Sequence, residues 1–356
     1  MAKYNVLILG ASYGSLLATK LLLCGHSVKL ACLPSEAELI NSEGTLVRLP
    51  VKTIGETVEI YSNGLPGKLS ADSPDKIDPT EFDLVALAMQ EPQYRTSGAR
   101  ELLKAVGQAK VPCMSIMNMP PLPYLKRVSG LAVSELEHCY ADSAVWDDCA
   151  PDLMTLASPD PQAFRPPEEK PNILQVGLPT NFKVAAFHNS AHTAILRNLE
   201  ADIMSIRFTT SKGEVELPVK LKVHDSIFVP FAKWPMLISG NYRCIGDNEM
   251  RPIKEAVHSD LETSKTIYNW VCELCKKLGA RRDDMVPFEK YANAALGLLK
   301  PSSAARGLFA GAPYIERVDK LVQSIAAQHG LRSNVVDEIV RRVDARSKSN
   351  RASKSA

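Results

Sequence analysis

Asn5-Val-Leu-Ile-Leu-Gly-Ala-Ser-Tyr-Gly-Ser-Leu-Leu-Ala18 is the stretch of this sequence that decides the fold. Val6 to Leu9 form a short apolar run, as in a buried strand, and leucines at helical spacing follow from Leu16. Between them, Gly10 to Ser15 predict a tight turn. Where a glycine-rich turn leads into a helix, free backbone N–H groups and the helix dipole converge, so a pyrophosphate can bind there.

The turn matches the dinucleotide-binding pattern G-x-G-x-x-G only in part. Its three slots hold Gly10, Ser12 and Ser15, with Gly14 beside the last. The turn alone is therefore a weak indication, although a serine still lets the backbone approach a phosphate and adds a hydroxyl donor. The alternative is a turn that binds another phosphate ligand or none. The candidate cofactor-binding residues here are Gly10, Ala11, Ser12, Tyr13, Gly14 and Ser15.

A second strand at Ser27 to Cys32 completes a βαβ unit and locates the position that selects the cofactor. An acid usually follows this strand when the cofactor is NAD, because a carboxylate accepts the ribose 2′-OH and repels a 2′-phosphate. Here the segment is Cys32-Leu-Pro-Ser35, which holds neither an acid nor an arginine. The sequence slightly favours NADP over NAD, with Ser35 as a phosphate donor.

The pattern continues as an α/β domain. Strands are predicted at 45–49, 57–61, 83–88 and 111–117, and helices at 35–41, where Ser35 would be the cap, and 95–106. Two of these strands run into Gln90 and Asn118. Ligands of an open parallel sheet bind at the carboxyl ends of its strands, so Gln90 and Asn118 are expected at the same edge as the Gly10 turn.

Composition limits the class of protein. The 356 residues, 45% of them hydrophobic, suffice for two or three domains, and a net charge of +2 indicates no broad basic surface for nucleic acid. The sequence has no apolar run of 18 residues and no charged leader with a signal core, so we expect a cytoplasmic protein without a membrane segment. Its eight scattered cysteines are typical of reduced, packed thiols.

The second half changes character. A proline-rich loop is predicted at 158–169, strands at 172–176 and 214–223, and a helix at 184–199. Beyond Ser226 the pattern is nearly all helical, with helices at 235–244, 259–278, 287–299, 314–329 and 334–346. We therefore predict a Rossmann-type doubly wound α/β domain at 1–222, a mostly helical domain at 223–346 and a polar, disordered tail at 347–356.

This order of motifs resembles the ketopantoate reductase (2-dehydropantoate 2-reductase) family. Its members are NADPH-dependent reductases with a Rossmann domain and a helical domain related to that of 6-phosphogluconate dehydrogenase. They have an asparagine where Asn118 stands, near the nicotinamide and the substrate, and usually a lysine where Gln90 stands. Between about 130 and 222 this chain is longer than the family pattern.

The second domain gives the more specific resemblance. The family has a lysine followed by asparagines four and eight residues later, and this chain has Lys233, Leu237 and Asn241. A serine pair and a later glutamate match Ser302-Ser303 and Glu316, with one residue inserted, whereas Gly307 falls near the place of an expected acid.

The resemblance implies roles for these residues. A lysine ammonium can stabilise the charge that develops on a reduced carbonyl oxygen and then donate a proton, and Lys233 is the candidate general acid. Glu316 is the candidate carboxylate that holds it, while Asn118, Asn241 and Ser303 would bind the substrate. Pro235 predicts that the helix begins just after Lys233, whereas the family's lysine lies within the helix.

The sequence therefore predicts an NAD(P)H-dependent oxidoreductase that reduces a small 2-oxo acid or related carbonyl compound. Gln90 and Leu237 argue against ketopantoate itself, because they change polar groups expected in the pocket. Two alternatives remain open: an opine- or imine-type dehydrogenase acting on C=N bonds, and a nucleotide-binding sensor without catalysis. The resemblance also implies a homodimer, for which the sequence specifies no interface.

Two smaller motifs indicate packing. His188 and His192 lie four residues apart on a predicted helix but lack a third ligand, so no metal is expected. Cys272 and Cys275 form a single C-x-x-C in an amphipathic helix, which favours packing over zinc or redox chemistry.

Overall fold

The computed structural model describes residues 2–355, with side chains up to residue 353, and divides into two compact units. The first contains the chain up to Met89, Gln93–Tyr124 and Ala144–Ile227. The second contains Gln90–Pro92, Leu125–Ser143 and the chain from Phe228 onward. The domain boundary predicted after Lys222 therefore falls inside a strand, β14 (Leu221–His224).

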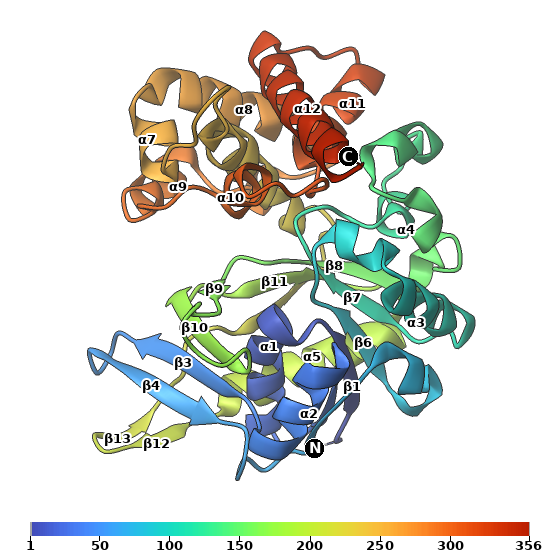
Figure 1. The fold of residues 1–356 in the computed structure, drawn as a ribbon, viewed down its shortest axis with the longest axis vertical. Helices are drawn as coiled ribbons and strands as arrows, with labels where there is room; N and C mark the ends of the chain where they lie inside the picture. The colour runs from blue at the N-terminus through green and yellow to red at the C-terminus, as the bar shows by residue number, and fades with distance from the viewer. Residues whose placement is uncertain (1, 356) are drawn as a thin grey trace. The chain divides into compact units, whose positions relative to one another are not determined.

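The first unit is built on an eight-stranded sheet of order β14-β11-β8-β7-β6-β1-β2-β5 (Figure 1). The six strands from β8 to β5 in this order are mutually parallel, and β11 pairs antiparallel with β8. Strand β1 lies between β2 and β6, so the chain changes direction across the sheet at β1, which confirms the doubly wound prediction. The bounds not yet given are β1 (Asn5–Leu9), β2 (Ser27–Ala31), β5 (Leu69–Asp72), β6 (Leu84–Leu87), β7 (Cys113–Ile116), β8 (Met154–Ser158) and β11 (Phe182–Ala185).

Apolar runs explain these strands. Val6 to Leu9 are at most 1% exposed, and the four residues of β6 are completely buried, as expected for strands covered on both faces. The helices of this unit are α1 (Ala11–Leu23), α2 (Pro34–Glu43), α3 (Ser97–Gln108) and α5 (Ser190–Ser205). Leu16, Leu17 and Leu21 of α1 are buried in the same core as Val6 and Ile8, so the helix that follows the turn packs on the sheet.

A smaller sheet has the strand order β4-β3-β10-β9. Its strands are β3 (Leu46–Val51), β4 (Glu56–Tyr61), β9 (Gln162–Phe164) and β10 (Ile173–Leu178). Strand β9 lies in the proline-rich segment predicted as a loop, because its backbone pairs with β10. The helix predicted at 184–199 begins only at Ser190, after β11.

The strand predicted at 214–223 is also interrupted. Hairpin strand β13 (Gly213–Val215), which pairs with β12 (Phe208–Thr210), and β14 are separate elements. Between them Val219 has φ +63°, a left-handed conformation that breaks an extended strand.

The second unit is helical. The predicted helices 259–278, 287–299, 314–329 and 334–346 correspond to α8 (Leu261–Lys277), α9 (Phe288–Ala295), α11 (Val318–Gln328) and α12 (Asn334–Ser355). The sequence did not predict α7 (Ile253–His258), α10 (Ser303–Phe309) or the short 3-10 segment η4 (Val133–Cys139).

The polar end of the chain is helical up to Ser355, where a disordered tail was predicted from Ser347. Ser347 is buried, and the Asn350 side-chain amide donates to the backbone oxygens of Leu308 (2.8 Å) and Ala312 (2.9 Å). The Arg346 guanidinium lies 3.7 Å from the centre of the Phe309 ring. These contacts order a segment whose composition alone indicates disorder.

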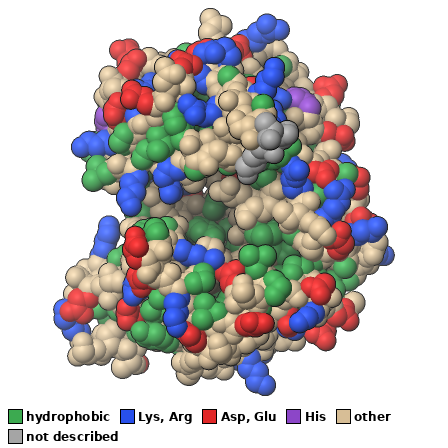
Figure 2. All heavy atoms as spheres, in the orientation of Figure 1, with side chains coloured by type: hydrophobic (Ala, Val, Ile, Leu, Met, Phe, Trp, Pro, Cys, Tyr) green, Lys and Arg blue, Asp and Glu red, His purple; other side chains and the backbone are tan. Residues whose placement is uncertain are grey.

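Among the described residues, the helices are too short or too polar to cross a bilayer. On the face drawn in Figure 2, Lys and Arg side chains are interspersed with Asp and Glu. The charge is therefore mixed on that face, in agreement with the small net charge of the sequence.

Candidate functional site

The Gly10 turn lies at the carboxyl end of β1, the strand on either side of which the chain adds strands in opposite directions across the sheet. Gly10 has φ +104°, and its N–H donates to Ala31 O (3.0 Å) at the end of β2. A Cβ atom there would lie 2.6 Å from Met89 Cγ and 3.0 Å from Ala88 O. The backbone conformation and the close approach of the segment after β6 both require glycine.

The first turn of α1 presents backbone donors. The first intrahelical bond runs from Gly14 N–H to Gly10 O (3.2 Å), so the amides of Ala11, Ser12 and Tyr13 precede the helical ladder. Together with the positive end of the helix dipole, these amides suit a phosphate. The residues present therefore fit a dinucleotide's pyrophosphate.

Gly14 takes the packing role expected of the last fingerprint glycine. A Cβ on Gly14 would lie 2.5 Å from Ile8 Cγ2 and 3.3 Å from Ala88 Cβ, so its absence lets α1 pack closely against the sheet. Ser15 in the nominal slot is buried, and its hydroxyl donates to Ser12 O (2.8 Å). The fingerprint is thus displaced by one residue, and Ser15 braces the turn.

Tyr13 points away from the turn toward the segment that leads into β9. Its hydroxyl donates to Pro161 O (2.7 Å), and its ring packs edge-on against Phe182 at 5.9 Å. Burial, reinforced by the Asp160 carboxylate, raises the pKa of Tyr13 well above its usual value, so the phenol stays protonated. Its role at the turn is structural, through the Pro161 bond.

The charged groups near the end of β2 lie outside the segment Cys32 to Ser35, which the sequence indicated as the position that selects the cofactor. Helix α2 begins at Pro34 with Leu33 at its N-cap, so Ser35 lies in the first turn and does not form the predicted cap. Next to it, Glu36 pairs with the guanidinium of Arg165, which directly follows β9. The sequence could not reveal this arginine, because 129 residues separate the two partners.

Gln90 and Asn118 follow strands β6 and β7, as predicted. Asn118 is half-buried two residues beyond β7, whose neighbours in the sheet are β6 and β8. Met89, whose side chain lies against Gly10, immediately precedes the exposed Gln90, and the Met89 N–H donates to Tyr94 Oη (3.2 Å). The end of β6 therefore adjoins the Gly10 turn, as the topology predicted.

In the second unit, a continuous helical run carries Lys233 and Asn241. It begins as the 3-10 turn η7 (Val229–Ala232), continues as α6 (Lys233–Met236), the π-helical segment η8 (Leu237–Asn241) and the 3-10 turn η9 (Tyr242–Cys244). Half-buried Lys233 is the first residue of α6, so the helix predicted at 235–244 begins two residues earlier and includes Lys233. The adjacent Trp234 is buried and stacks on Phe231 at 4.1 Å, which anchors this end of the run.

Tyr291 of α9 accounts for the π-helical segment. Its hydroxyl donates to Met236 O (3.0 Å). In a regular α-helix this carbonyl would accept a hydrogen bond from a backbone N–H of the same helix. A Cβ on Gly240 would lie 1.9 Å from that hydroxyl oxygen, so only glycine leaves room for it. The wider turn sets the orientation of Asn241 relative to Lys233, and π-bulges of this kind are frequent at functional sites.

Two hydrogen-bonded contacts bring the other predicted residues to this run. Ser302, the N-cap of α10, donates through its hydroxyl to Asn241 O (2.7 Å). Tyr242 Oη donates to Glu316 O (2.5 Å) and accepts from Val318 N–H (3.0 Å). The segments that carry Asn241, Ser303 and Glu316 are therefore tied together at one end of the helical run.

The side chains around this junction differ in exposure. Glu316 is buried and Asn241 is half-buried, whereas Ser303 is exposed at the first residue of α10. The neighbouring cation, Arg317, forms a two-point pair with Asp319 (3.0 Å each) and bonds to Asp344 (2.5 Å). The sequence indicated Ser302 only as one of the serine pair, with no role of its own, and it missed Tyr242, because nothing in the spacing of this residue distinguishes it from core residues.

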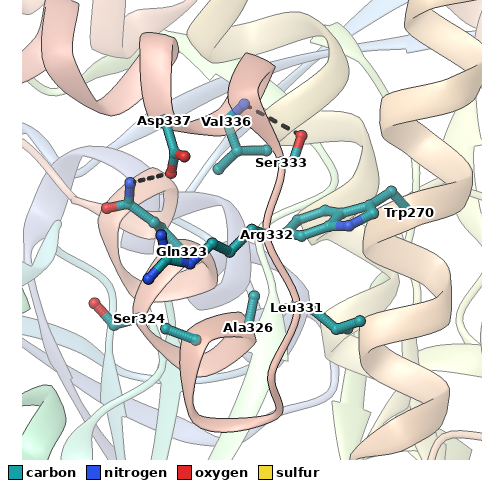
Figure 3. A pocket seen from close by; sticks show the side chains of 10 residues that line it. Trp270, Gln323, Ser324, Ala326, Leu331, Arg332, Ser333, Val336 and Asp337 are labelled. Atoms are coloured by element: carbon teal, nitrogen blue, oxygen red, sulfur yellow. Dashed lines mark hydrogen bonds between the residues drawn. The ribbon is translucent and has the colours of Figure 1, made fainter.

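A separate cavity of about 290 Å³ lies elsewhere in the second unit and contains none of these residues (Figure 3). Trp270 of α8, Gln323 of α11 and Arg332 of the loop before α12 line it, and Gln323 Nε2 donates to Asp337 Oδ1 (2.6 Å). It is partly open to solvent and is not the predicted site.

The two smaller motifs do not form a site. His188 is exposed and precedes α5, so it does not share the predicted helix with His192, which packs edge-on against Phe187 at 5.7 Å. Cys272 and Cys275 are buried free thiols on α8, and burial raises the pKa of Cys272 to about 11. Such thiols are poor nucleophiles and poor metal ligands at neutral pH.

By sequence, neither a protein-family model nor a curated protein matches this chain. By structure, it has the fold of the ketopantoate reductases over nearly its full length. The 2-dehydropantoate 2-reductase of Methylococcus capsulatus is 12% identical, with a TM-score of 0.63 over 97% of both chains. A dimeric ketopantoate reductase of Staphylococcus aureus is 10% identical, with a TM-score of 0.63 over 97% of this chain and 99% of that one.

A dehydrogenase shares this fold. D-mandelate dehydrogenase, solved with NADH and anilino(oxo)acetate, is 13% identical, with a TM-score of 0.63 over 98% of this chain and 99% of that one. The comparisons confirm the predicted fold class, a Rossmann-type sheet followed by a helical domain.

Proposed function

We propose that this chain is an NAD(P)H-dependent oxidoreductase that reduces a small 2-oxo acid or a related carbonyl compound. The observation that carries the proposal is the junction in the second unit, where Ser302 ties the segment of Ser303, and Tyr242 the segment of Glu316, to the helical run of Lys233 and Asn241. The structural neighbours support it, since they include ketopantoate reductases and a D-mandelate dehydrogenase bound to NADH.

The first unit would hold the cofactor. Gly10 to Ser15 would bind its pyrophosphate through the amides of the first turn of α1, and Ser35 would donate to a 2′-phosphate, which favours NADP. Gln90 and Asn118 would lie at the nicotinamide end, because they follow β6, which is next to β1, and β7, which is next to β6. The bound reduced nicotinamide would supply the hydride.

The second unit would supply the proton. Reduction of a carbonyl leaves negative charge on its oxygen, which the Lys233 ammonium would stabilise and then protonate. A buried carboxylate is stable when it faces a cation, and we assign Glu316 to Lys233 in this role. Asn118, Asn241 and Ser303 would hydrogen-bond the substrate's carboxylate and hydroxyl groups.

The substrate should differ from ketopantoate. Leu237, where the family pattern has an asparagine, is only 4% exposed and offers no hydrogen bond. Loss of one polar partner in a closed site changes affinity by about 1–3 kcal/mol. A more apolar 2-oxo acid, without a hydroxyl to satisfy, fits this change best.

The test is turnover. Purified protein should oxidise NADPH or NADH, followed by absorbance, with at least one member of a panel of aliphatic and aromatic 2-oxo acids. A requirement for an added amine would move the reaction to C=N reduction. Cofactor binding without turnover across the panel would favour a sensor. By analogy with the S. aureus enzyme we also propose a homodimer, to be measured by light scattering.

A further inference from the structure

One short segment of the first unit is bonded to both of the first two helices. Between the end of β8 and the residue after β9, the chain accepts the Tyr13 hydroxyl at Pro161 O (2.7 Å) and places Arg165 against Glu36. Tyr13 lies in the first turn of α1 and Glu36 in the first turn of α2. We call Ser158 to Arg165 the bridging segment.

In a dinucleotide-binding fold, the first turns of these two helices lie where two parts of the same cofactor bind. The pyrophosphate binds at the N-terminus of the helix after the first strand, and the adenosine ribose is recognised after the second. Here β1 and β2 are adjacent and parallel, with Leu9 beside Ala31. The bridging segment therefore contacts both elements that would hold the ADP half of the cofactor.

The charges at the end of β2 are balanced in pairs. Glu36 is held by Arg165, with side chains 14% and 28% exposed, and Asp72 is held by Lys29 at 3.1 Å. Burial, together with Glu36 and Asp72 and against the opposing effect of Arg165, raises the pKa of the nearby Cys32 thiol to about 12. Without Arg165, this edge would present Glu36 unneutralised and would repel a phosphate.

Arg165 has the chemistry that a 2′-phosphate requires. A guanidinium binds phosphate through two parallel N–H···O bonds, and a dianionic phosphate is a stronger partner than one carboxylate. Glu36 holds the side chain at the end of β2, so that the exchange of partners needs little movement of the backbone.

We propose that Arg165 selects NADPH over NADH by exchanging Glu36 for the 2′-phosphate of the cofactor. The inference rests on the proposed function, since it assumes that the first unit binds a nicotinamide dinucleotide. It assigns the selectivity to a residue supplied by the bridging segment and not by the segment that follows β2.

A second ion pair provides a matched control. Lys170 lies five residues beyond Arg165 and pairs with Glu43 at 2.7 Å, at the last residue of the same helix α2. Lys170→Met removes a comparable contact between the same two parts of the chain, far from the first turn of α2. It should leave the cofactor preference unchanged.

The experiment is calorimetric titration of the full chain and its variants with NADPH and with NADH. Wild type should bind NADPH at least tenfold more tightly than NADH, about 1.4 kcal/mol. Arg165→Met should weaken NADPH binding at least tenfold and change NADH binding less than threefold. Arg165→Lys should retain part of the preference, and Glu36→Gln should strengthen NADPH binding.

The outcomes separate the two proposals. Wild type could bind both cofactors while Arg165→Met shows the same ratio of NADPH to NADH affinity as wild type. This result would overturn the assignment of Arg165 and leave the proposed function standing. Equal loss of both cofactors in Arg165→Met and Arg165→Lys would mean that the residue only supports the fold, which also overturns it. Tighter NADH binding by wild type would assign Glu36 to the ribose 2′-OH instead. Absence of binding by wild type would remove both proposals.

Discussion

The two units place their candidate functional groups on different kinds of structure. In the first, the site consists of backbone: the Gly10 conformation, the amides of the first turn of α1 and the close approach allowed by Gly14. In the second it consists of side chains: Lys233 and Asn241 on short and irregular helical segments, and Glu316 in the non-helical segment before α11. Substitutions in the first unit should therefore change stability or cofactor binding, and those in the second should change turnover.

The Gly10 turn fits a dinucleotide better than its partial match to the pattern G-x-G-x-x-G indicates. Ser15 occupies the slot where the fingerprint has glycine, yet the position that demands glycine is Gly14, where a Cβ atom would lie 2.5 Å from Ile8 Cγ2. A fingerprint is therefore better judged by what each glycine does than by its letter position.

Removal of the Lys233 ammonium should have the largest effect. Lys233→Ala should lower kcat by about 10²–10⁴-fold, the usual contribution of a general acid, while calorimetry shows unchanged NADPH affinity. Lys265→Ala, which removes an exposed lysine of the same unit paired with Glu289, serves as the control. Wild-type kcat in Lys233→Ala would exclude Lys233 from the mechanism. A loss of cofactor affinity in the same variant would contradict the assignment of cofactor binding to the first unit and of proton transfer to the second.

Lys20, at the other end of α1 from the turn, should impose a pH dependence on stability. It is 3% exposed and donates to Pro218 O (2.5 Å), and burial, then Lys220, lowers its pKa to about 7, while Cys24 and Glu216 oppose the shift. Because the folded pKa lies below the unfolded value of about 10.4, the unfolded chain binds more protons between them, so stability rises with pH in this range.

Denaturant unfolding of wild type and Lys20→Met measures this effect. The free energy of unfolding of wild type minus that of the variant should increase by about 3 kcal/mol from pH 7 to pH 10, whereas exposed Lys52→Met should show no such change. A difference independent of pH would mean that Lys20 is charged in the folded protein. NADPH affinity should stay the same in Lys20→Met.

The π-helical segment offers a test within the second unit. Gly240→Ala should lower kcat at least tenfold, about 1.4 kcal/mol, because the new Cβ displaces the Tyr291 hydroxyl that holds Met236 O. Addition of Tyr291→Phe removes the clashing oxygen, so the double variant should recover part of the activity. If Gly240→Ala keeps full kcat, the orientation of Asn241 does not depend on the π turn.

Gly14→Ala should have the smallest effect, and on stability alone. Overpacking against Ile8 costs about 1–3 kcal/mol, from which roughly 1 kcal/mol of improved helix propensity is subtracted. Gly98→Ala in α3 is the matched control, since its Cβ would meet Pro74 at an ordinary 3.4 Å, and should be neutral or stabilising. Thermal unfolding distinguishes the two, and equal melting temperatures would show that α1 can shift away from the sheet without cost.

The parts of the fold that the sequence predicts best are those with a local signal. Strands β1 and β6 follow from continuous apolar runs and β2 and β7 from mostly apolar ones, and the edge that carries Asn118 follows from their order. The Arg165–Glu36 pair and strand β9 could not be predicted, because they depend on pairing between segments distant in sequence.

In the second unit, the order of residues along the chain proposed Lys233, Asn241 and Glu316 as site residues, but it did not predict the contacts that hold their segments. Tyr291 acts on Met236 from 55 residues away, and Tyr242 reaches Glu316 across 74. The helical end of the chain depends likewise on Asn350 bonding to Leu308 and Ala312. Such contacts have no local periodicity that a sequence pattern could reveal.

The measurement that tests the central claim most directly is titration of the purified chain with NADPH and NADH, followed by turnover on the panel of 2-oxo acids. We expect tight binding of NADPH and oxidation of the cofactor by at least one panel member, and loss of that oxidation in Lys233→Ala. Failure to bind either cofactor would contradict it, because the Gly10 turn would then not be a dinucleotide site.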